Sequence, residues 1–371
     1  MFRAIDKWLP GTLRHAWRVR GLLARAARPL HLIFCVADHF EPFRGGASKT
    51  RALDLVRRWV DEYPDSAAEF KDADGCGPRH TFFYPHEEYD KDCLDQLTRL
   101  CAAGHGEIEI HLHHRNDTPA GFREKLVGFR DRLRREHGLL GTDRDGVVRY
   151  GFVHGNWSLC NSRPDGDWCG VNEELGILRE TGCYADFTYP SAPSPTQPRM
   201  VNALYYAKDA PGRPRGPDRG VRCGVVGVRD GEEPGDLLLI QGPLALNWRS
   251  RKWGVLPRLE NAEISGGNPP SAERLGLWTA QHIHVHGRPD WVFVKLHTHG
   301  CVEGNRRVLL GAPMRRLHRI LATQYNDTQH WHLHYVTARE MYNIVRAAEA
   351  GTSNDPGAYR DFEIGHPDGA R

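Results

Sequence analysis

The chain has 371 residues, long enough for one large domain or two ordinary ones with a sizeable buried core. Hydrophobic residues make up 40% of it and charged residues 26%, which is typical of globular proteins and excludes a disordered or fibrous chain. The formal net charge of +3 is close to neutral for this length, so we expect no nucleic-acid partner.

Positive charge is concentrated in residues 1–29, where arginines stand among apolar residues such as Trp8 and Trp17. Two interpretations stay open: a surface helix that packs on the domain, or an interfacial helix that contacts anionic lipid. The segment lacks the continuous apolar stretch of a secretory signal. The nine cysteines are odd in number and form no Cys-x-x-Cys pair. We therefore expect reduced thiols in a cytoplasmic protein, with peripheral membrane association as the alternative.

From residue 30 onward, apolar runs of strand length alternate with helical spacing. In chain order the patterns predict a strand within 31–37, a helix over 50–63, a strand at 80–85, a helix over 89–104, a strand at 106–112, a helix over 121–138, a strand within 147–157, a helix over 172–182, a strand that passes into a loop over 183–190, a strand at 236–241, a helix over 271–283, strands at 291–300 and 331–336, and a helix over 337–351. This alternation indicates a parallel sheet or an α/β barrel.

Two segments rich in proline and glycine, "PSAPSPTQPRM" and "DAPGRPRGPDRG", interrupt the alternation within residues 187–235 and predict long surface loops. Because the alternation resumes after them, we expect no domain boundary there. Residues 1–29 are then a basic amphipathic segment, and residues 30–371 form a single elaborated α/β domain.

Polar residues collect where the predicted strands end, which is where parallel α/β proteins place their active sites. The ends of the successive strands carry Asp38, His39 and Glu41; His111, His113 and His114; His154, Asn156 and Trp157; Asp186; and His297 and His299. Metal ligands and acid–base groups thus recur at one end of several strands. This recurrence indicates a site at that edge.

The stretch "GEIEIHLHHRND" is the strongest single indication of a metal. His111 and His113 are two residues apart, so on a strand both project to one side and can share a cation. Together with His39, with Asp38 beside it, they predict a site for one divalent ion, zinc or another first-row metal. His114 points the other way on an ideal strand and remains a reserve ligand.

The order of these strand ends resembles the polysaccharide deacetylase superfamily, the NodB-homology domain. "LIFCVADHF", "HTFFYP", "GHGEIEIHLHH", "FVHGNW", "GCYADFT" and "VFVKLHTH" are similar to successive motifs of that family. The resemblance covers about residues 30–300 and lies in motif order more than in identity. It implies a distorted (β/α) barrel and a metal-dependent enzyme that removes acyl groups from amino sugars or related amides.

The resemblance also implies roles for particular residues. Asp38 matches the family's base, His39 stands where its metal-binding acid is usual, and His111 matches the first metal histidine. His297 matches the general acid by position, and His299 is the competing candidate.

The chain departs from the family pattern at three places, one of which is the final Leu-x-His motif, which reads "KLH" here. Arg115 stands where the second metal histidine is expected, and Val153 or His154 stands in place of an arginine that orients the base.

We therefore expect a hydrolase acting on carbon–nitrogen bonds other than peptide bonds, with a glycan or small molecule bearing an N-acyl group as its substrate. His154, Asn156, Trp157 and Asp186 are the candidate substrate-binding residues, and Trp157 would stack on a sugar ring. Two alternatives stay open. One is a non-catalytic carbohydrate-binding or regulatory protein on the same scaffold. The other is a different metal hydrolase, acting on cyclic amides or resembling a glycosidase.

Overall fold

A computed structural model describes residues 4–226, 235–353 and 355–367. The strands are β1 (Leu30–His39), β2 (His80–Pro85), β3 (Gly106–Leu112), β4 (Tyr150–His154), β5 (Cys183–Asp186), β6 (Leu204–Ala207), β7 (Gly220–Arg222), β8 (Leu237–Ile240), β9 (Ala245–Lys252), β10 (Leu256–Glu260), β11 (Glu263–Ile264), β12 (Trp291–Thr298) and β13 (Trp331–Tyr335). The helices are α1 (Ile5–Arg18), α2 (Leu22–Arg25), α3 (Lys49–Ala67), α4 (Lys91–Leu100), α5 (Pro119–His137), α6 (Glu174–Glu180), α7 (Ala272–Ala280), α8 (Glu303–Leu309), α9 (Ala312–Gln324) and α10 (Ala338–Glu349).

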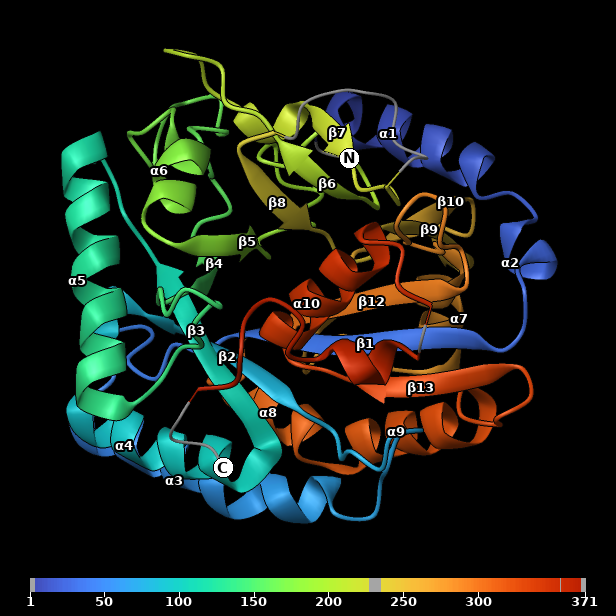
Figure 1. The fold of residues 1–371 in the computed structure, drawn as a ribbon, viewed down its shortest axis with the longest axis horizontal. Coiled ribbons are helices and arrows are strands. Elements are labelled where there is room, and N and C mark those ends of the chain that lie inside the picture. Colours follow the sequence, from blue (N-terminus) through green and yellow to red (C-terminus); the bar gives the residue numbers. More distant parts are fainter. Residues whose placement is uncertain (1–3, 227–234, 354, 368–371) are drawn as a thin grey trace.

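An eleven-stranded sheet runs through the middle of the molecule, and helices pack around it (Figure 1). The strand order is β11-β12-β1-β2-β3-β4-β5-β8-β6-β7, and β13 pairs with β1 as well. β6 runs antiparallel to β7 and β8, while the pairings from β11 through β8 are parallel. β9 and β10 form a separate antiparallel ribbon. The chain is therefore an α/β protein with a large, mostly parallel sheet.

Strand β1 is the centre of this arrangement. It pairs along its length with β12, while its other edge pairs with β13 near Leu30–Phe34 and with β2 near Ala37–His39. All three partners run parallel to it, so their carboxyl ends lie on the same side of the molecule.

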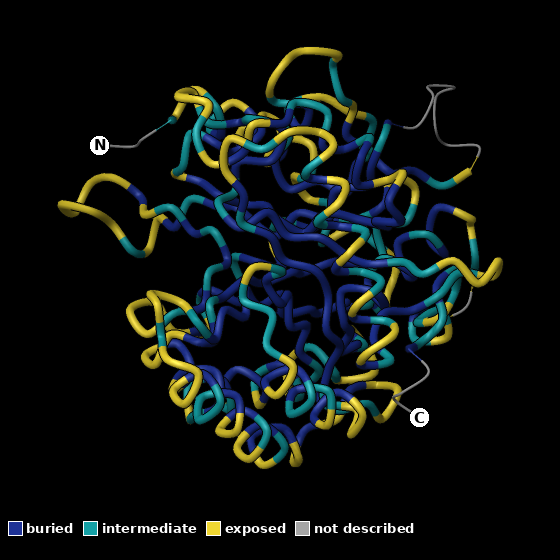
Figure 2. The backbone as a smooth tube through the Cα atoms, turned by 90° about the vertical axis from the view of Figure 1, so that its left-hand side faces the viewer, coloured by how far each residue is buried: buried dark blue, intermediate teal, exposed yellow. Residues whose placement is uncertain are grey.

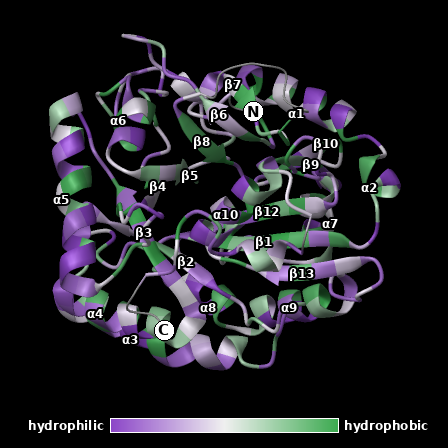
Figure 3. Ribbon diagram, in the orientation of Figure 1, coloured by the Kyte–Doolittle hydropathy of each residue, from purple (hydrophilic) through white to green (hydrophobic). Residues whose placement is uncertain are grey.

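Successive side chains of β1 enter two different hydrophobic cores. Val36 belongs to the core shared with α3, α4 and α5, whereas Ala37 belongs to a second core that includes residues of α10. Because side chains alternate along a strand, Asp38 continues the first face and His39 the second. Figure 2 shows the sheet strands buried and the outer sides of the helices exposed, and Figure 3 shows β1 and β12 as largely hydrophobic.

The predicted alternation of strands and helices is confirmed over most of the chain, including the first strand. A capping box of Thr337 and Glu340 begins α10. The sequence predicts only loops over residues 187–235, but the short strands β6 and β7 lie there. Residues 227–234 of that stretch lie outside the described residues. The ribbon of β9 and β10 and the helices α8 and α9 were also not predicted.

The N-terminal helix α1 packs on the domain, as the first of the two interpretations expects. Trp8 is buried in a small core with Val201 and Leu244, while Trp17 on the same helix is 81% exposed. None of the helices in the described part of the chain combines the length and the apolar character that a membrane crossing requires.

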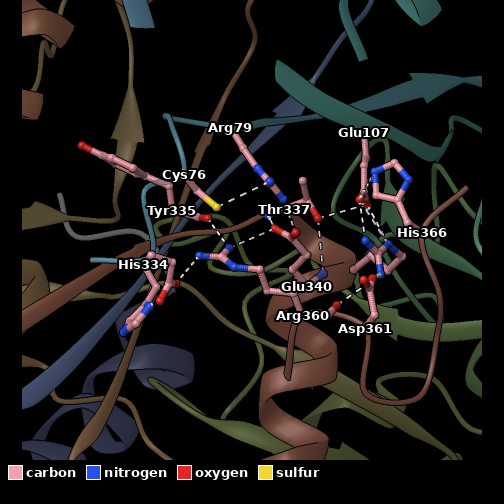
Figure 4. A network of polar contacts seen from close by, with 12 residues as sticks. Cys76, Arg79, Glu107, His334, Tyr335, Thr337, Glu340, Arg360, Asp361 and His366 are labelled. Atoms are coloured by element: carbon pink, nitrogen blue, oxygen red, sulfur yellow. Dashed lines mark hydrogen bonds and ion pairs between the residues drawn. The ribbon is translucent and has the colours of Figure 1, made fainter. Parts of the chain in front are cut away.

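A network of buried ion pairs lies at the amino ends of β2 and β3 and beside the carboxyl end of β13 (Figure 4). Arg339, at the start of α10, donates to both carboxylate oxygens of Glu107 on β3 at 2.8–3.1 Å. Arg360, in the C-terminal segment, contacts Asp72 at 3.0 Å and Glu340 at 3.3 Å. These pairs join α10 and the C-terminal segment to one end of the sheet. The predicted site residues lie at the other end.

Candidate metal centre

The carboxyl ends of β1, β3 and β12 bring a set of polar side chains together. Ala37 pairs with His297 across β1 and β12, so His39 and His299, each two residues further on, end up side by side. Their imidazole ring centroids are 4.7 Å apart. The ring of His111, at the end of β3, lies 4.8 Å from that of His39.

Glu41 lies at the middle of this cluster. Its Oε1 atom is 3.2 Å from Nε2 of His111 and 3.4 Å from Nε2 of His113. Four ligands placed tetrahedrally at 2.0–2.1 Å from zinc lie roughly 3.4 Å from one another, so these separations fit a shared ion. Glu41 belongs to two overlapping sets whose ligand atoms lie within 4.8 Å of one another: His39, Glu41 and His299; and Glu41, His111 and His113. We call these five residues the open cluster.

The hydrogen bonds around His111 present a lone pair to this centre. Nδ1 of His111 donates to the carbonyl oxygen of Val153 at 2.9 Å, so in the neutral ring Nε2 faces Glu41 as an acceptor. Metal-binding histidines are commonly oriented in this way by a carbonyl on their other nitrogen. Two acceptors facing each other repel, and a cation between them removes that repulsion.

The protonation states of His39 and His299 agree with this geometry, whereas that of His113 does not. Burial, then the neighbouring His299 and His111, lower the pKa of His39 well below its usual value. Burial also lowers the pKa of His299 to about 4. Burial acts to lower the pKa of His113 as well, but its hydrogen bonds to Glu41 and Glu87 raise that pKa to about 9. His39 and His299 are therefore neutral at physiological pH, the form in which imidazole binds metals.

The cluster is buried on its protein side and reaches solvent at its rim. Glu41 and His111 are buried, while the side chain of His113 is 29% exposed. Trp157 is half-buried, and its ring centroid lies 6.1 Å from both His39 and His299. A rim of this kind is typical of a catalytic metal site, which keeps one position accessible, and less typical of a closed structural site.

Asp38 is next to His39 in sequence but engages other partners. Its Oδ2 accepts from Nε2 of His80 at 2.8 Å, and its Oδ1 accepts from the backbone amide of Gly300 at 2.6 Å. The side chain is fully buried on the face that packs against Trp59 of α3. The structure thus places the carboxylate under the loop that carries His299 rather than among the histidines of the open cluster.

Two other predicted site residues, His297 and Asp186, lie in the protein interior. His297 shares a face with His299 but lies deeper, and burial, then Lys295, lower its pKa well below the usual value. Asp186 is buried, accepts from the amide and hydroxyl of Thr188, and has a pKa raised by burial to about 7.

His154 and the half-buried Asn156 lie at the end of β4. The Nε2 atom of His154 lies 2.9 Å from that of His114. The structure therefore brings His39, His111, His113 and Trp157 together, while His154 meets His114 on the other side of the strand ends.

Two members of the open cluster were not predicted as ligands. Glu41 stands two residues after His39, and His299 stands two residues after His297. Period-two spacing past a strand end was the available signal, and it was applied to His111 and His113 but not to these pairs.

Comparison with known families finds no family model that matches the chain, and comparison with functionally curated proteins finds no match either.

Proposed function

We propose that the chain is a metal-dependent hydrolase that removes an acyl group from an N-acylated sugar or a related amide. The observation that carries the proposal is the open cluster: a buried glutamate among four histidines, at the carboxyl ends of parallel strands, with a solvent-accessible rim. His39, Glu41 and His111 would hold a divalent ion, with His113 or His299 completing the ligand set. Zinc suits this donor set best, and other first-row metals also accept it.

An ion at this position would lower the pKa of a bound water and polarise the carbonyl group of the substrate. The protein groups supply the rest. Trp157 flanks the histidines and offers a flat apolar face to a sugar ring. A neutral His297 or His299 accepts a proton and returns it to the departing amine, as a general acid must. Asp38 is the proposed base by resemblance, and its bonds to His80 and Gly300 also suit a positioning role.

The proposal extends to the fold. A sheet that encloses a second core with α10 is the arrangement expected of a distorted (β/α) barrel of the polysaccharide deacetylase type. Membership of that superfamily is supported by motif order and by the placement of His39 and His111 at matching strand ends.

The test combines metal content with turnover. Freshly purified protein should contain a first-row metal and hydrolyse N-acetylated amino sugars, and a chelator should abolish hydrolysis until metal is restored. His111→Ala should lose metal and activity together. Asp38→Asn and His297→Ala should each retain metal and lose about 10²–10⁴-fold in turnover, the usual contribution of acid–base groups.

The alternatives give different outcomes. Normal turnover in Asp38→Asn would remove Asp38 from the chemistry, and a dead His299→Ala beside an active His297→Ala would move the acid two residues along. Metal-dependent glycan binding without hydrolysis would make the chain a binding protein. Hydrolysis of cyclic amides but not acetamides would change the substrate class.

A further inference from the structure

A second group of metal-ligand side chains lies behind the open cluster. His114 follows β3, His154 ends β4, Cys169 lies in the long loop after β4, and Glu174 begins α6. One ligand atom from each lies within 4.8 Å of the others, and all four residues are buried. We call these four residues the closed cluster. It shares no residue with the open cluster, because the adjacent His113 and His114 point to opposite sides of the chain.

The atoms of the closed cluster crowd around Nε2 of His114. Nε2 of His154 lies 2.9 Å from it, and Oε1 of Glu174 lies 2.9 Å from it as well. The thiol of Cys169 is 3.1 Å from the other oxygen of Glu174. These separations are somewhat shorter than the roughly 3.4 Å between ligands around zinc, so small outward shifts of the side chains would admit one cation.

Without a cation, the atoms of the closed cluster are joined only by shared protons. Nδ1 of His114 donates to Asp117, so Nε2 of the neutral ring is an acceptor, and Nε2–H of His154 donates to it. Oε1 of Glu174 then faces a lone pair and has no hydrogen-bond partner among the described residues. A His114 protonated on both nitrogens would donate to Asp117 and Glu174, with His154 accepting at Nε2 and carrying its own proton on Nδ1. A cation held by His114, His154 and Glu174 would take the place of the proton that these groups otherwise share.

The surrounding groups are those that orient metal ligands. Asp117 accepts a hydrogen bond from Nδ1 of His114 at 3.1 Å, and the two form a carboxylate–histidine pair. Lys125 in turn donates to Asp117 at 2.6 Å. The backbone amides of Asn161 and Val171 donate to the sulfur of Cys169 at 3.4 Å and 3.5 Å. Amides directed at a sulfur stabilise a thiolate, the form of cysteine that binds metal.

We propose that His114, His154, Cys169 and Glu174 hold a structural zinc ion. One thiolate and one carboxylate together balance the charge of a divalent cation, and four buried protein ligands make a closed tetrahedral site. Binding replaces the thiol proton of Cys169 with a sulfur–metal bond and releases that proton to solvent. As a ligand through Nε2, His154 carries its proton on Nδ1, so it gives up the weak 3.3 Å contact from the amide of Asn156.

The ion would fix the loop between β4 and α6 onto the end of β3. The amide of Asp117 already donates to the carbonyl oxygen of Cys169 at 2.9 Å, and Gly170 adopts a φ of +110° where a Cβ atom would lie 2.4 Å from the Asp117 nitrogen. The same loop begins with Trp157, which flanks His39 and His299. The closed cluster thereby positions one wall of the open cluster without contacting a substrate.

Cobalt substitution of the full-length protein tests the proposal independently of any activity. Protein stripped with a chelator and reconstituted with Co²⁺ should show a thiolate-to-cobalt charge-transfer band in the near ultraviolet. Cys169→Ser should lose the band. Cys160→Ser is the matched control and should keep it, because this equally buried thiol of the same loop donates to Asp209 instead. His111→Ala should also keep it, so failure of the open cluster and of the closed cluster are separate results.

Hydrogen exchange provides a second measurement that needs only the wild-type chain. Removing zinc should accelerate amide exchange in residues 157–172 by about tenfold or more, while residues 49–67 of α3 stay protected. Three results would each overturn the proposal. The first is wild-type protein that binds cobalt without a thiolate band, and the second is a band that survives in Cys169→Ser. The third is amide exchange in the loop that is the same before and after metal removal.

Discussion

At the scale of single residues, strand alternation decides which polar groups meet. His39 and Asp38 are neighbours, yet His39 lies among the histidines while Asp38 bonds to His80 and Gly300 on the other face. Alternation also sends His113 to Glu41 and His114 to Glu174, as the sequence predicts for an ideal strand. The site residues that alternation governs could be predicted from the sequence.

The partners of those residues could not be predicted in the same way. Oδ1 of Asp38 is satisfied by an amide 262 positions away, and nothing near Asp38 in the sequence signals that contact. Glu41 lies beyond the strand end, where the chain leaves ideal geometry, so its place between His111 and His113 depends on how β1 and β3 are arranged in the sheet.

Gly300→Ala tests the role of Asp38 in holding the loop after β12. A Cβ atom at Gly300 would lie 2.0 Å from Oδ2 of Asp38 and 2.6 Å from the ring of Trp59. We expect a loss of about 1–3 kcal/mol in the free energy of unfolding, as for overpacked cores. Gly304→Ala is the control, because the nearest atom to its added Cβ is 3.8 Å away. Denaturant unfolding measures both, and equal stability of the two variants would contradict the tight contact.

His318 should make stability depend on pH below neutrality. Burial lowers its pKa to about 3, and Nδ1 lies 2.9 Å from the hydroxyl of Tyr335. Between the unfolded pKa of about 6.5 and the folded one, only the unfolded state binds the proton, so stability falls as pH falls. Within that pH range, His318→Gln should reduce the slope of the unfolding free energy against pH by up to about 1.4 kcal/mol per pH unit.

The packing cost of that substitution is separable from its titration. Near pH 7.5 histidine is neutral in both states, so the difference in unfolding free energy between wild type and His318→Gln at about that pH reports packing alone. If the unfolding free energies of wild type and His318→Gln run parallel from pH 7.5 down to about pH 4, His318 takes up its proton equally in the folded and unfolded states. That result would contradict the lowered pKa.

At the scale of elements, predictability follows the strength of the local pattern. β2 and β12 are buried along their whole length and β1 at every position but His31, and their apolar runs identify them. β6 and β7 have only four and three residues and lie between segments rich in proline and glycine. They are strands because β8 and each other supply their hydrogen-bond partners, and their sequences contain no such information.

The start of α10 depends on a buried ion pair that can be broken from one side. Glu107→Gln should cost about 3–5 kcal/mol, because Arg339 would keep its charge in a buried position with its main partner neutralised. Asp54→Asn on α3 removes a partner of Arg57 and Arg58 at the surface and should leave the unfolding midpoint nearly unchanged. A Glu107→Gln protein as stable as Asp54→Asn would show that the network of Figure 4 does not hold the helix.

At the scale of the whole molecule, the two ends of the sheet differ in kind. The amino ends carry charged pairs that are closed by their own partners, as Glu107 and Arg339 show. The carboxyl ends carry histidines and carboxylates whose ligand atoms face one another, as His111 and Glu41 show. The first arrangement is complete without a ligand, whereas the second could hold a metal ion.

The outer surface of α1 is suited to contact with a membrane. Trp17 is 81% and Leu13 57% exposed, and Arg14 and Arg18 are exposed beside them, while Trp8 anchors the other face of the helix. An aromatic and aliphatic surface among arginines suits the boundary of an anionic bilayer. We expect the protein to sediment with vesicles containing phosphatidylserine, less so at high salt, and not with phosphatidylcholine alone.

Trp17→Ala should weaken that sedimentation several-fold without lowering stability, since the ring is in solvent. Trp253→Ala is the matched control: this tryptophan is 73% exposed in the turn between β9 and β10 and is not part of the helix. If α1 carries the contact, only the first substitution matters, because interfacial affinity scales with the apolar area that enters the bilayer. Equal loss from both would extend the contact surface to the ribbon of β9 and β10. Binding that ignores both substitutions and the lipid charge would leave α1 as a helix that only packs on the domain.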